Sequence, residues 1–284
     1  MKRVFLLIVL LSIVSTTHAQ GKFKKDEYQA PVLASTEDIS KELSNPNTPL
    51  ASLTFKTSYT AFEGDLTGAD DQDSLTTLFQ PVFPFPIDHA TKTNLFIRPA
   101  IPIVWKTPTL GSNGFRDVNG IGDIGFDIAL GRTYQNGTVL VGGMQGLIPL
   151  KNHLSVNQWR FGPEFLYAYL SKKWYAAIFP SHLWDTSGNE QYSNTQIEIF
   201  AGLYFENAWT LITNPKLSYN WVTDQTTIPL NLTVRKVTKL GSTPLKLELG
   251  FDYYVEKDDA FGQDWAINLS ITPVIDNFIY NLFK

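Results

Sequence analysis

The chain contains no cysteine among its 284 residues. This absence excludes a disulfide scaffold, a thiolate metal site, a cysteine nucleophile and a lipid-anchored N-terminus. The chain also lacks an excess of basic charge: its formal net charge is −4 and it carries no basic patch that indicates a nucleic-acid partner. We therefore expect no cofactor, no metal ion and no nucleic acid.

Long hydrophobic runs are missing after the first 19 residues. Lys2 and Arg3 precede an apolar run over 4–14, and Thr17 and Ala19 supply small residues before a cleavage point at Gln20. This arrangement predicts a signal peptide over residues 1–19. The run is short for a spanning helix, which needs about 20 apolar residues. The mature chain is then an exported soluble protein or a membrane β-barrel.

What the sequence has in abundance is alternation between apolar and polar residues. Over 245–255, Leu249 and Phe251 fall on one face of a strand, and Lys246, Glu248 and Asp252 fall on the other. An apolar face on every strand, with charges on the opposite face, is typical of a barrel with lipid outside and water inside. The 7 Trp, 12 Tyr and 19 Phe residues suit the aromatic girdles of such a barrel.

The pattern predicts an all-β fold, an antiparallel up-and-down transmembrane β-barrel of about 12 strands over 51–275, with ten or fourteen strands as the alternatives. An even number places both ends in the periplasm of a Gram-negative bacterium. Prolines within strands predict bulges or rim positions. Longer outer loops are expected at 63–73, 106–120, 185–194 and 257–262. The strands are expected at 51–62, 74–86, 93–105, 121–132, 137–148, 158–170, 173–185, 195–206, 208–221, 226–237, 244–256 and 263–275.

Residues 20–50 differ from the strands in composition. Ser35 or Thr36 is a good N-cap for a short helix that reaches about Leu43, and Asn45-Pro46 ends it. The segment is either a periplasmic lead-in or a plug inside the lumen. Residues 276–284 form a C-terminal tail.

Charged and amide residues on the polar faces are the candidate lumen-lining residues. Balanced charges inside a barrel either orient a solute in a narrow pore or make salt bridges that keep the barrel rigid, and the sequence leaves both interpretations open. The residues are Arg98, Asp123, Asp127, Arg160, Glu164, Glu198, Lys216, Arg235, Lys246, Glu248, Asp252 and Asn268.

Two features imitate known sites. His153, Ser155 and Asn157 are the residue types of an outer-membrane lipid hydrolase, but their spacing does not fit, and we expect no enzyme. The acidic loops around 63–73 and 258–259 are a conceivable calcium site, yet their spacing matches no calcium loop. Solvated loops are the simpler interpretation.

Short motifs in a fixed order give the chain a family resemblance. It resembles the bacterial outer-membrane transporter family named for the meta pathway of phenol degradation. The resemblance implies an outer-membrane β-barrel that takes up small hydrophobic compounds, and it carries no catalytic set. Ser181 departs from the asparagine that the family has before its histidine. The motifs are at 45–46 (NP), 80–84 (QPVFP), 120–123 (GIGD), 159–163 (WRFGP), 181–184 (SHLW), 228–232 (IPLNL) and 237–241 (VTKLG).

The sequence therefore predicts an outer-membrane channel for passive uptake of small, including hydrophobic or aromatic, solutes. Its expected partners are outer-membrane lipids, lipopolysaccharide and the solute, and its oligomeric state stays open. The alternatives are a structural or adhesive barrel that acts through acidic loops and, less favoured, the lipid hydrolase.

Overall fold

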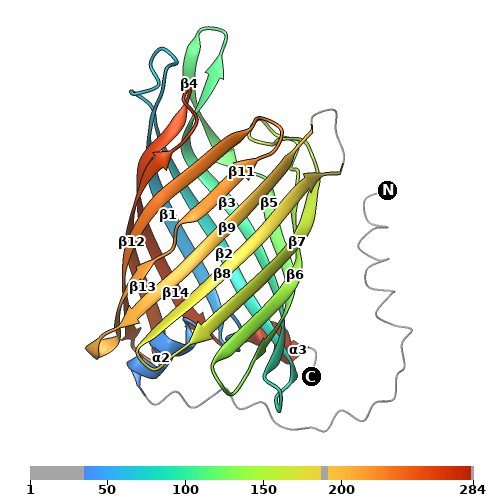
Figure 1. Cartoon of the computed structure of the whole chain (residues 1–284), viewed down its shortest axis with the longest axis vertical. Coiled ribbons are helices and arrows are strands. Elements are labelled where there is room, and N and C mark those ends of the chain that lie inside the picture. The colour runs from blue at the N-terminus through green and yellow to red at the C-terminus, as the bar shows by residue number, and fades with distance from the viewer. Residues whose placement is uncertain (1–34, 187–190, 283–284) are drawn as a thin grey trace. The chain divides into compact units, whose positions relative to one another are not determined.

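Figure 1 shows the chain as a computed structural model that describes residues 35–186 and 191–282. Within these ranges, antiparallel strands form one sheet that closes on itself as a twelve-stranded β-barrel. The predicted fold is confirmed. The predicted signal peptide, residues 20–34 and the last two residues lie outside the described ranges. No helix in the described part is long and apolar enough to cross a membrane.

The described chain has fourteen strand segments, β1 to β14, but the wall of the barrel has twelve strands, for two reasons. β4 pairs with β3 off the main path, and β10 and β11 share the position between β9 and β12, where Asn214-Pro215 breaks one predicted strand. The short helices are α2 (Thr36–Glu42), η2 (Glu206–Ala208) and α3 (Phe278–Leu282). The strands are β1 (Ala51–Glu63), β2 (Asp73–Asp88), β3 (Thr93–Gly111), β4 (Gly114–Ile121), β5 (Ile124–Thr133), β6 (Thr138–Ile148), β7 (Arg160–Leu170), β8 (Trp174–Asp185), β9 (Ser193–Tyr204), β10 (Trp209–Thr213), β11 (Lys216–Asn220), β12 (Gln225–Leu240), β13 (Thr243–Glu256) and β14 (Gly262–Ile275).

The two ends of the barrel differ. One end, called the turn end, carries the short connections at 89–92, 134–137, 171–173, 205–208 and 241–242. The opposite end, called the loop end, carries the longer connections at 64–72, 149–159 and 257–261. The first and last barrel strands, β1 and β14, pair directly and close the wall, with Ala51 opposite Ile275 at the turn end.

One predicted loop is wrong. Residues 106–120 form a hairpin at the loop end, in which β3 continues to Gly111 and β4 returns from Gly114. The hairpin is visible above the barrel wall in Figure 1. Asn113-Gly114 is a strong hairpin signal, and Gly114 has a φ of +100°, which glycine adopts without strain.

The prolines lie within strands, where the ladder between β2 and β3 is interrupted. Phe79 pairs with Ile101 and Phe83 pairs with Ile97, and the ladder records no pairs between them. Pro81 and Pro99 fall in this gap, and neither has an N–H to donate. A register shift between Pro86 and Asp88 is one of the bulges that the prolines predict.

Alternation along each strand separates an apolar outer face from a polar lumen. In β13, Leu249 and Phe251 point outward and are 59% and 47% exposed. The side chain of Glu248, on the opposite face, is 17% exposed. Exposed aromatic residues lie near both ends of the outer face, an arrangement typical of lipid-facing barrels. They are Trp105, Trp159, Trp184 and Trp221 near the loop end, and Tyr134, Tyr169, Trp174 and Trp209 near the turn end.

Candidate functional site

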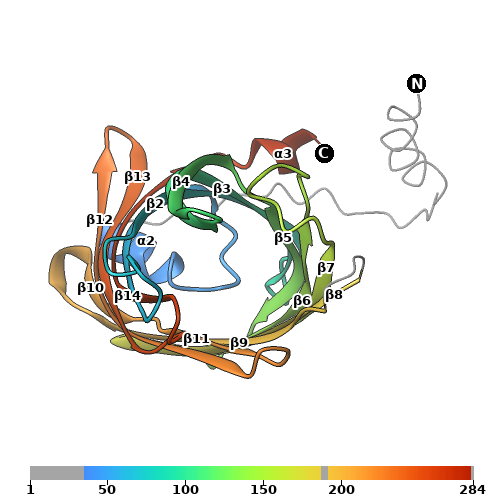
Figure 2. The same cartoon turned by 90° about the horizontal axis from the view of Figure 1, so that it is seen from above.

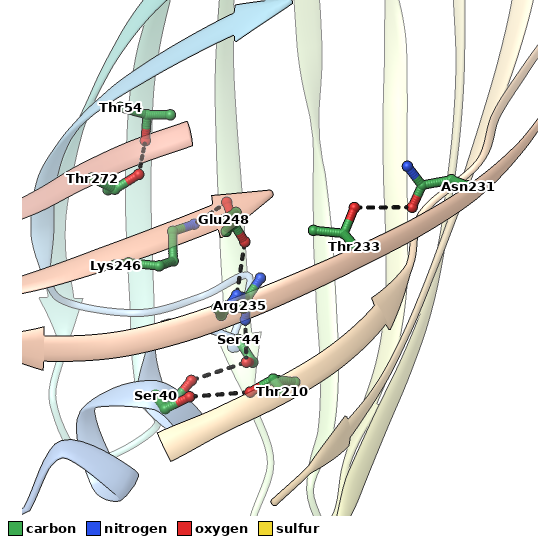
Figure 3. A network of polar contacts seen from close by, with 10 residues as sticks. All are labelled: Ser40, Ser44, Thr54, Thr210, Asn231, Thr233, Arg235, Lys246, Glu248 and Thr272. Carbon is green, nitrogen blue, oxygen red and sulfur yellow. Dashed lines mark hydrogen bonds and ion pairs between the residues drawn. The ribbon is translucent and has the colours of Figure 1, made fainter. Parts of the chain in front are cut away.

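One group of lumen residues is rich in positive charge. We call Lys56, Arg235, Lys246 and Glu248 the basic cluster. Arg235 Nε lies 2.7 Å from Glu248 Oε1, and Lys246 Nζ lies 3.3 Å from Glu248 Oε2. Figure 3 shows Glu248 between the two cations. Because one carboxylate serves two cations and Lys56 adds a third, this part of the lumen has a net positive charge.

A second group is rich in negative charge. We call Arg98, Asp127 and Glu164 the acidic cluster. Arg98 and Asp127 are neighbours across β3 and β5, and their Nε and Oδ1 atoms are 2.7 Å apart. Glu164 on β7 is 5% exposed, and the charges of both other members act on it. Its Oε1 atom has no hydrogen-bond partner within the described residues.

The two clusters lie on different sides of the lumen. The basic cluster comes from β1, β12 and β13, and the acidic cluster comes from β3, β5 and β7. Figure 2 shows β12 and β13 on one side of the ring and β5 and β7 on the other. The excess charges of these two clusters are therefore separated, and Glu198 on β9 interacts electrostatically with both Lys56 and Arg98.

Other predicted lumen residues make polar contacts outside these two clusters. Asp252 accepts hydrogen bonds from Asn231 Nδ2 and Asn268 Nδ2, both at 2.6 Å. Glu198 on β9 is the register partner of Lys216 on β11. These contacts place Asp252, Asn268, Glu198 and Lys216 among polar neighbours on the sheet.

Asp123 and Arg160 lie at the loop end. The Asp123 carboxylate accepts hydrogen bonds from the backbone N–H groups of Leu150 (2.8 Å) and Val156 (2.9 Å). Asp123 therefore fixes the β6–β7 loop. The guanidinium of Arg160 stacks 3.5 Å from the ring centroid of Tyr192. Both residues make local contacts that stabilise the rim of the barrel.

Helix α2 begins where the sequence predicts. Ser35 is its N-cap and accepts a hydrogen bond from the Asp38 N–H at 3.1 Å, and Leu43 follows as its C-cap. The predicted helix is confirmed. Ile39 packs against Ala208 and Val237, which attaches the helix to η2 and β12 at the turn end. In Figure 2, α2 and the chain that follows it lie within the ring of strands.

Polar contacts hold this segment to the basic cluster. Arg235 Nη1 donates a hydrogen bond to Ser44 Oγ at 2.8 Å, and Ser40 Oγ lies 3.3 Å from Thr210 Oγ1. Figure 3 shows the chain of contacts from Glu248 through Arg235 to Ser44. Arg235 therefore connects the lumen charges with the N-terminal segment.

Asn47 provides a second attachment on the opposite side. Its Nδ2 donates to Lys92 O and Thr133 Oγ1, both at 2.8 Å, and its carbonyl accepts from Asn94 Nδ2 at 2.9 Å. Asn47 is 1% exposed. A Cβ atom at Gly131 would lie 2.5 Å from Asn47 Oδ1, so only glycine leaves room for this side chain.

The residues that resemble a hydrolase do not assemble as one. His153 Nε2 lies 2.8 Å from Asn119 O, and Ser155 Oγ accepts from the Asn157 N–H at 3.0 Å. His182 contacts Thr195 and Ser193 with its two nitrogens. Within the part of the chain that the structure describes, no group of three or more His, Asp or Glu residues is arranged to hold a metal ion.

The sequence interpretation missed two lumen residues, Lys56 and Ser270. Phe55 and Tyr59 are outward and about 40% exposed, so the period of two already puts Lys56 on the inner face. Ser270 follows Asn268 by two residues in β14 and shares its face. The two are direct register partners across β1 and β14.

No protein-family model and no curated protein matches the chain. Among solved structures, it is similar to the COG4313 outer membrane channel from Pseudomonas putida F1. That match covers 80% of this chain and 94% of that chain, with a TM-score of 0.62 and 14% identity. The chain is also similar to the NanC porin, with coverage of 79% and 99%, a TM-score of 0.52 and 8% identity. At these identities the likeness is one of fold.

Proposed function

We propose that the chain is an outer-membrane channel through which small solutes, hydrophobic or aromatic ones included, cross passively. The observation that carries the proposal is a closed barrel with an apolar exterior and a charged lumen. A barrel with a core made only for rigidity has no need of separated basic and acidic sides. The two similar solved structures, a channel and a porin, support the same reading.

In this proposal residues 35–50 are a plug. The segment is anchored on two sides of the turn end, by Ser44 to Arg235 and by Asn47 to Lys92 and Thr133. Each of these hydrogen bonds is worth about 1 kcal/mol net where both partners are neutral, and about 2 kcal/mol where the donor is the charged Arg235. Such a segment is displaced at moderate cost, whereas the barrel wall is not.

Planar-bilayer conductance of the refolded chain without residues 1–19 tests the proposal. We expect brief openings for this chain and a several-fold larger mean current after residues 20–50 are also removed. Heat-modifiable migration on a gel verifies folding of each protein. Silence from both folded proteins overturns the channel.

A pair of glycine substitutions tests the plug without a deletion. Gly131→Ala places a methyl group against Asn47, whereas a Cβ on Gly142, in the neighbouring strand, meets nothing within 4 Å. We expect G131A to raise the mean current and G142A to leave it unchanged. Equal currents in the two variants contradict the plug.

An adhesive barrel, and one that binds lipopolysaccharide, would both act through the acidic loops at the loop end. There two of the acidic side chains already have cationic partners in the chain: Asp73 pairs with Lys106, and Glu63 pairs with Lys257. These pairs reduce the negative charge left for a divalent-ion bridge. We propose contact with the surrounding lipids through the apolar wall, and favour the channel over adhesion.

A further inference from the structure

A cavity of about 170 Å³ opens beside the basic cluster. Its polar wall is a row of residues that neighbour one another across four strands: Arg235 pairs with Glu248, Glu248 with Ser270, and Ser270 with Lys56. Lys246 lies on the same face of β13, two residues before Glu248. One row of the sheet thus brings three cations and one carboxylate to the cavity.

The carboxylate does not satisfy all three cations. Glu248 contacts Arg235 and Lys246. Within residues 35–186 and 191–282, no carboxylate oxygen lies within 4.0 Å of Lys56 Nζ. Glu198 interacts electrostatically with Lys56, but at more than this distance. The lining of the cavity therefore has a net positive charge, and Lys56 can form an ion pair with an anionic ligand.

Ser270 gives an independent sign of a ligand. It lines the cavity, is 5% exposed, and its Oγ has no hydrogen-bond partner in the described part of the chain. Buried hydroxyl groups are nearly always hydrogen-bonded, so an orphan that faces a cavity indicates a partner from outside the chain. Lys56 and Ser270 are adjacent across β1 and β14, and both can donate to the same anionic group.

Two apolar side chains line the other end of the cavity, Phe200 on β9 and Ile212 on β10, beside the polar Asn214 and Thr233. The strand order places β9 and β10 at one edge of the cavity and β14 and β1 at the other, with β12 and β13 between them. A ligand that fits has an anionic group at one end and an apolar body at the other. An apolar protein cavity of about 150 Å³ holds a benzene molecule, so the space suits a single ring.

We propose that this cavity is a binding subsite for a small organic carboxylate with an apolar, single-ring body. Lys56 and Ser270 hold the carboxylate, Lys246 and Arg235 add attraction, and Phe200 and Ile212 contact the ring. The inference rests on the proposed function in one respect, since solutes must enter the lumen to reach the site. Binding itself is measurable whether or not the barrel conducts.

The test compares 4-fluorobenzoate with 4-fluorobenzamide, a neutral probe of the same shape, by fluorine NMR on the refolded chain in detergent. We expect the carboxylate to bind at least about tenfold more tightly than the amide, because a charge-assisted hydrogen bond is lost in the amide. Lys56→Met should weaken carboxylate binding about tenfold, and Ser270→Ala about threefold. Amide binding should change little in either variant.

Lys172→Met is the matched control, because Lys172 is exposed in the β7–β8 turn, away from the cavity. Equal binding of the two probes, or unchanged carboxylate binding in K56M, overturns the subsite. If inorganic phosphate competes as well as benzoate at equal concentration, the single-ring assignment is wrong. If the barrel conducts but carboxylate binding does not depend on Lys56, the subsite is rejected and the channel is retained. If binding depends on Lys56 but the barrel does not conduct, the channel is rejected and the subsite is retained.

Discussion

The two charged clusters of the lumen differ in sign, in exposure and in what they hold. In the basic cluster, Arg235 is 9% exposed at its side chain and bonds both Glu248 and the N-terminal segment. In the acidic cluster, the side chain of Arg98 is 28% exposed and bonds Asp127 alone among the described residues. Similar arginine–carboxylate pairs, with the same 2.7 Å contact, therefore serve different ends.

The total charge of a lumen therefore says little about its electrostatic field. A nearly balanced set of charges gives a polarised lumen where basic and acidic clusters lie on different strands. A polarised lumen orients a solute that has one charged end, whereas a uniformly mixed lumen favours only rigidity.

The largest expected effect concerns the two arginines. Arg235→Ala leaves Glu248 short of one partner in a buried setting and should cost about 3 kcal/mol in the free energy of unfolding. Arg98→Ala should cost less, about 1 kcal/mol, because the Arg98 side chain is 28% exposed and, unlike Arg235, makes no contact with the N-terminal segment. Urea-dependent unfolding in lipid vesicles measures both. Equal losses would mean that the two pairs are energetically alike, contrary to the exposures.

The next largest effect is expected on the affinity for 4-fluorobenzoate when one negative charge is removed from either cluster. Glu248→Gln leaves the basic cluster with three cations and should tighten binding of 4-fluorobenzoate about threefold. Glu164→Gln removes the same charge from the other side of the lumen and should change that affinity less. Both variants are measured by fluorine NMR, and the reverse order would show that the field is not local.

Acidity should affect the plug through Glu42. Burial raises the pKa of the Glu42 carboxyl above its ordinary value of 4.5, against the hydrogen bonds from Thr48 and Asn45, which lower it. The docked segment therefore binds a proton more tightly than the free segment. Docking is strongest below about pH 4.5 and weakens as the pH rises through the raised pKa.

The corresponding measurement is the mean current of the refolded chain as a function of pH. We expect the current to fall as the solution becomes acidic. Glu42→Gln, which imitates the protonated state, should give a low current that no longer follows the pH in this range. A current that responds to pH equally in both proteins would assign the effect to another group.

The smallest effect is expected at the loop end, far from both clusters. Lys257 pairs with Glu63 and lies 3.0 Å from Asp264. Lys257→Ala should cost at most about 1 kcal/mol in unfolding free energy, and less at high salt, because salt screens partly exposed pairs such as Lys257 with Glu63. A loss as large as that of R235A would place an unrecognised structural role in this loop.

Much of the fold could be predicted from the sequence because alternation is local. Each of the twelve barrel positions matches a predicted range, and Ser35 caps α2 as expected. The hairpin at 106–120 was missed because Asn113-Gly114 lies in a stretch interpreted as a long loop. Asn214-Pro215 divides a predicted strand, since proline removes a ladder hydrogen bond there.

The candidate site was less predictable. The period of two indicates that Lys246 and Glu248 face inward, but it does not say which residues of other strands stand beside them. The row from Arg235 to Lys56 depends on the register of three strand pairs, and one-residue shifts would replace every member. Contacts of Ser44 and Asn47 with the wall join residues far apart in the chain.

The barrel, about twelve strands and the apolar or polar character of each face could be predicted from the sequence, because these follow from side-chain alternation along single strands. The grouping of charges into two clusters and the contact between Arg235 and Ser44 depend on the tertiary structure. So does the placement of Lys56 and Ser270 beside one cavity. The physical reason is that charge interactions act through space at a few ångströms, and those distances are set by register and closure.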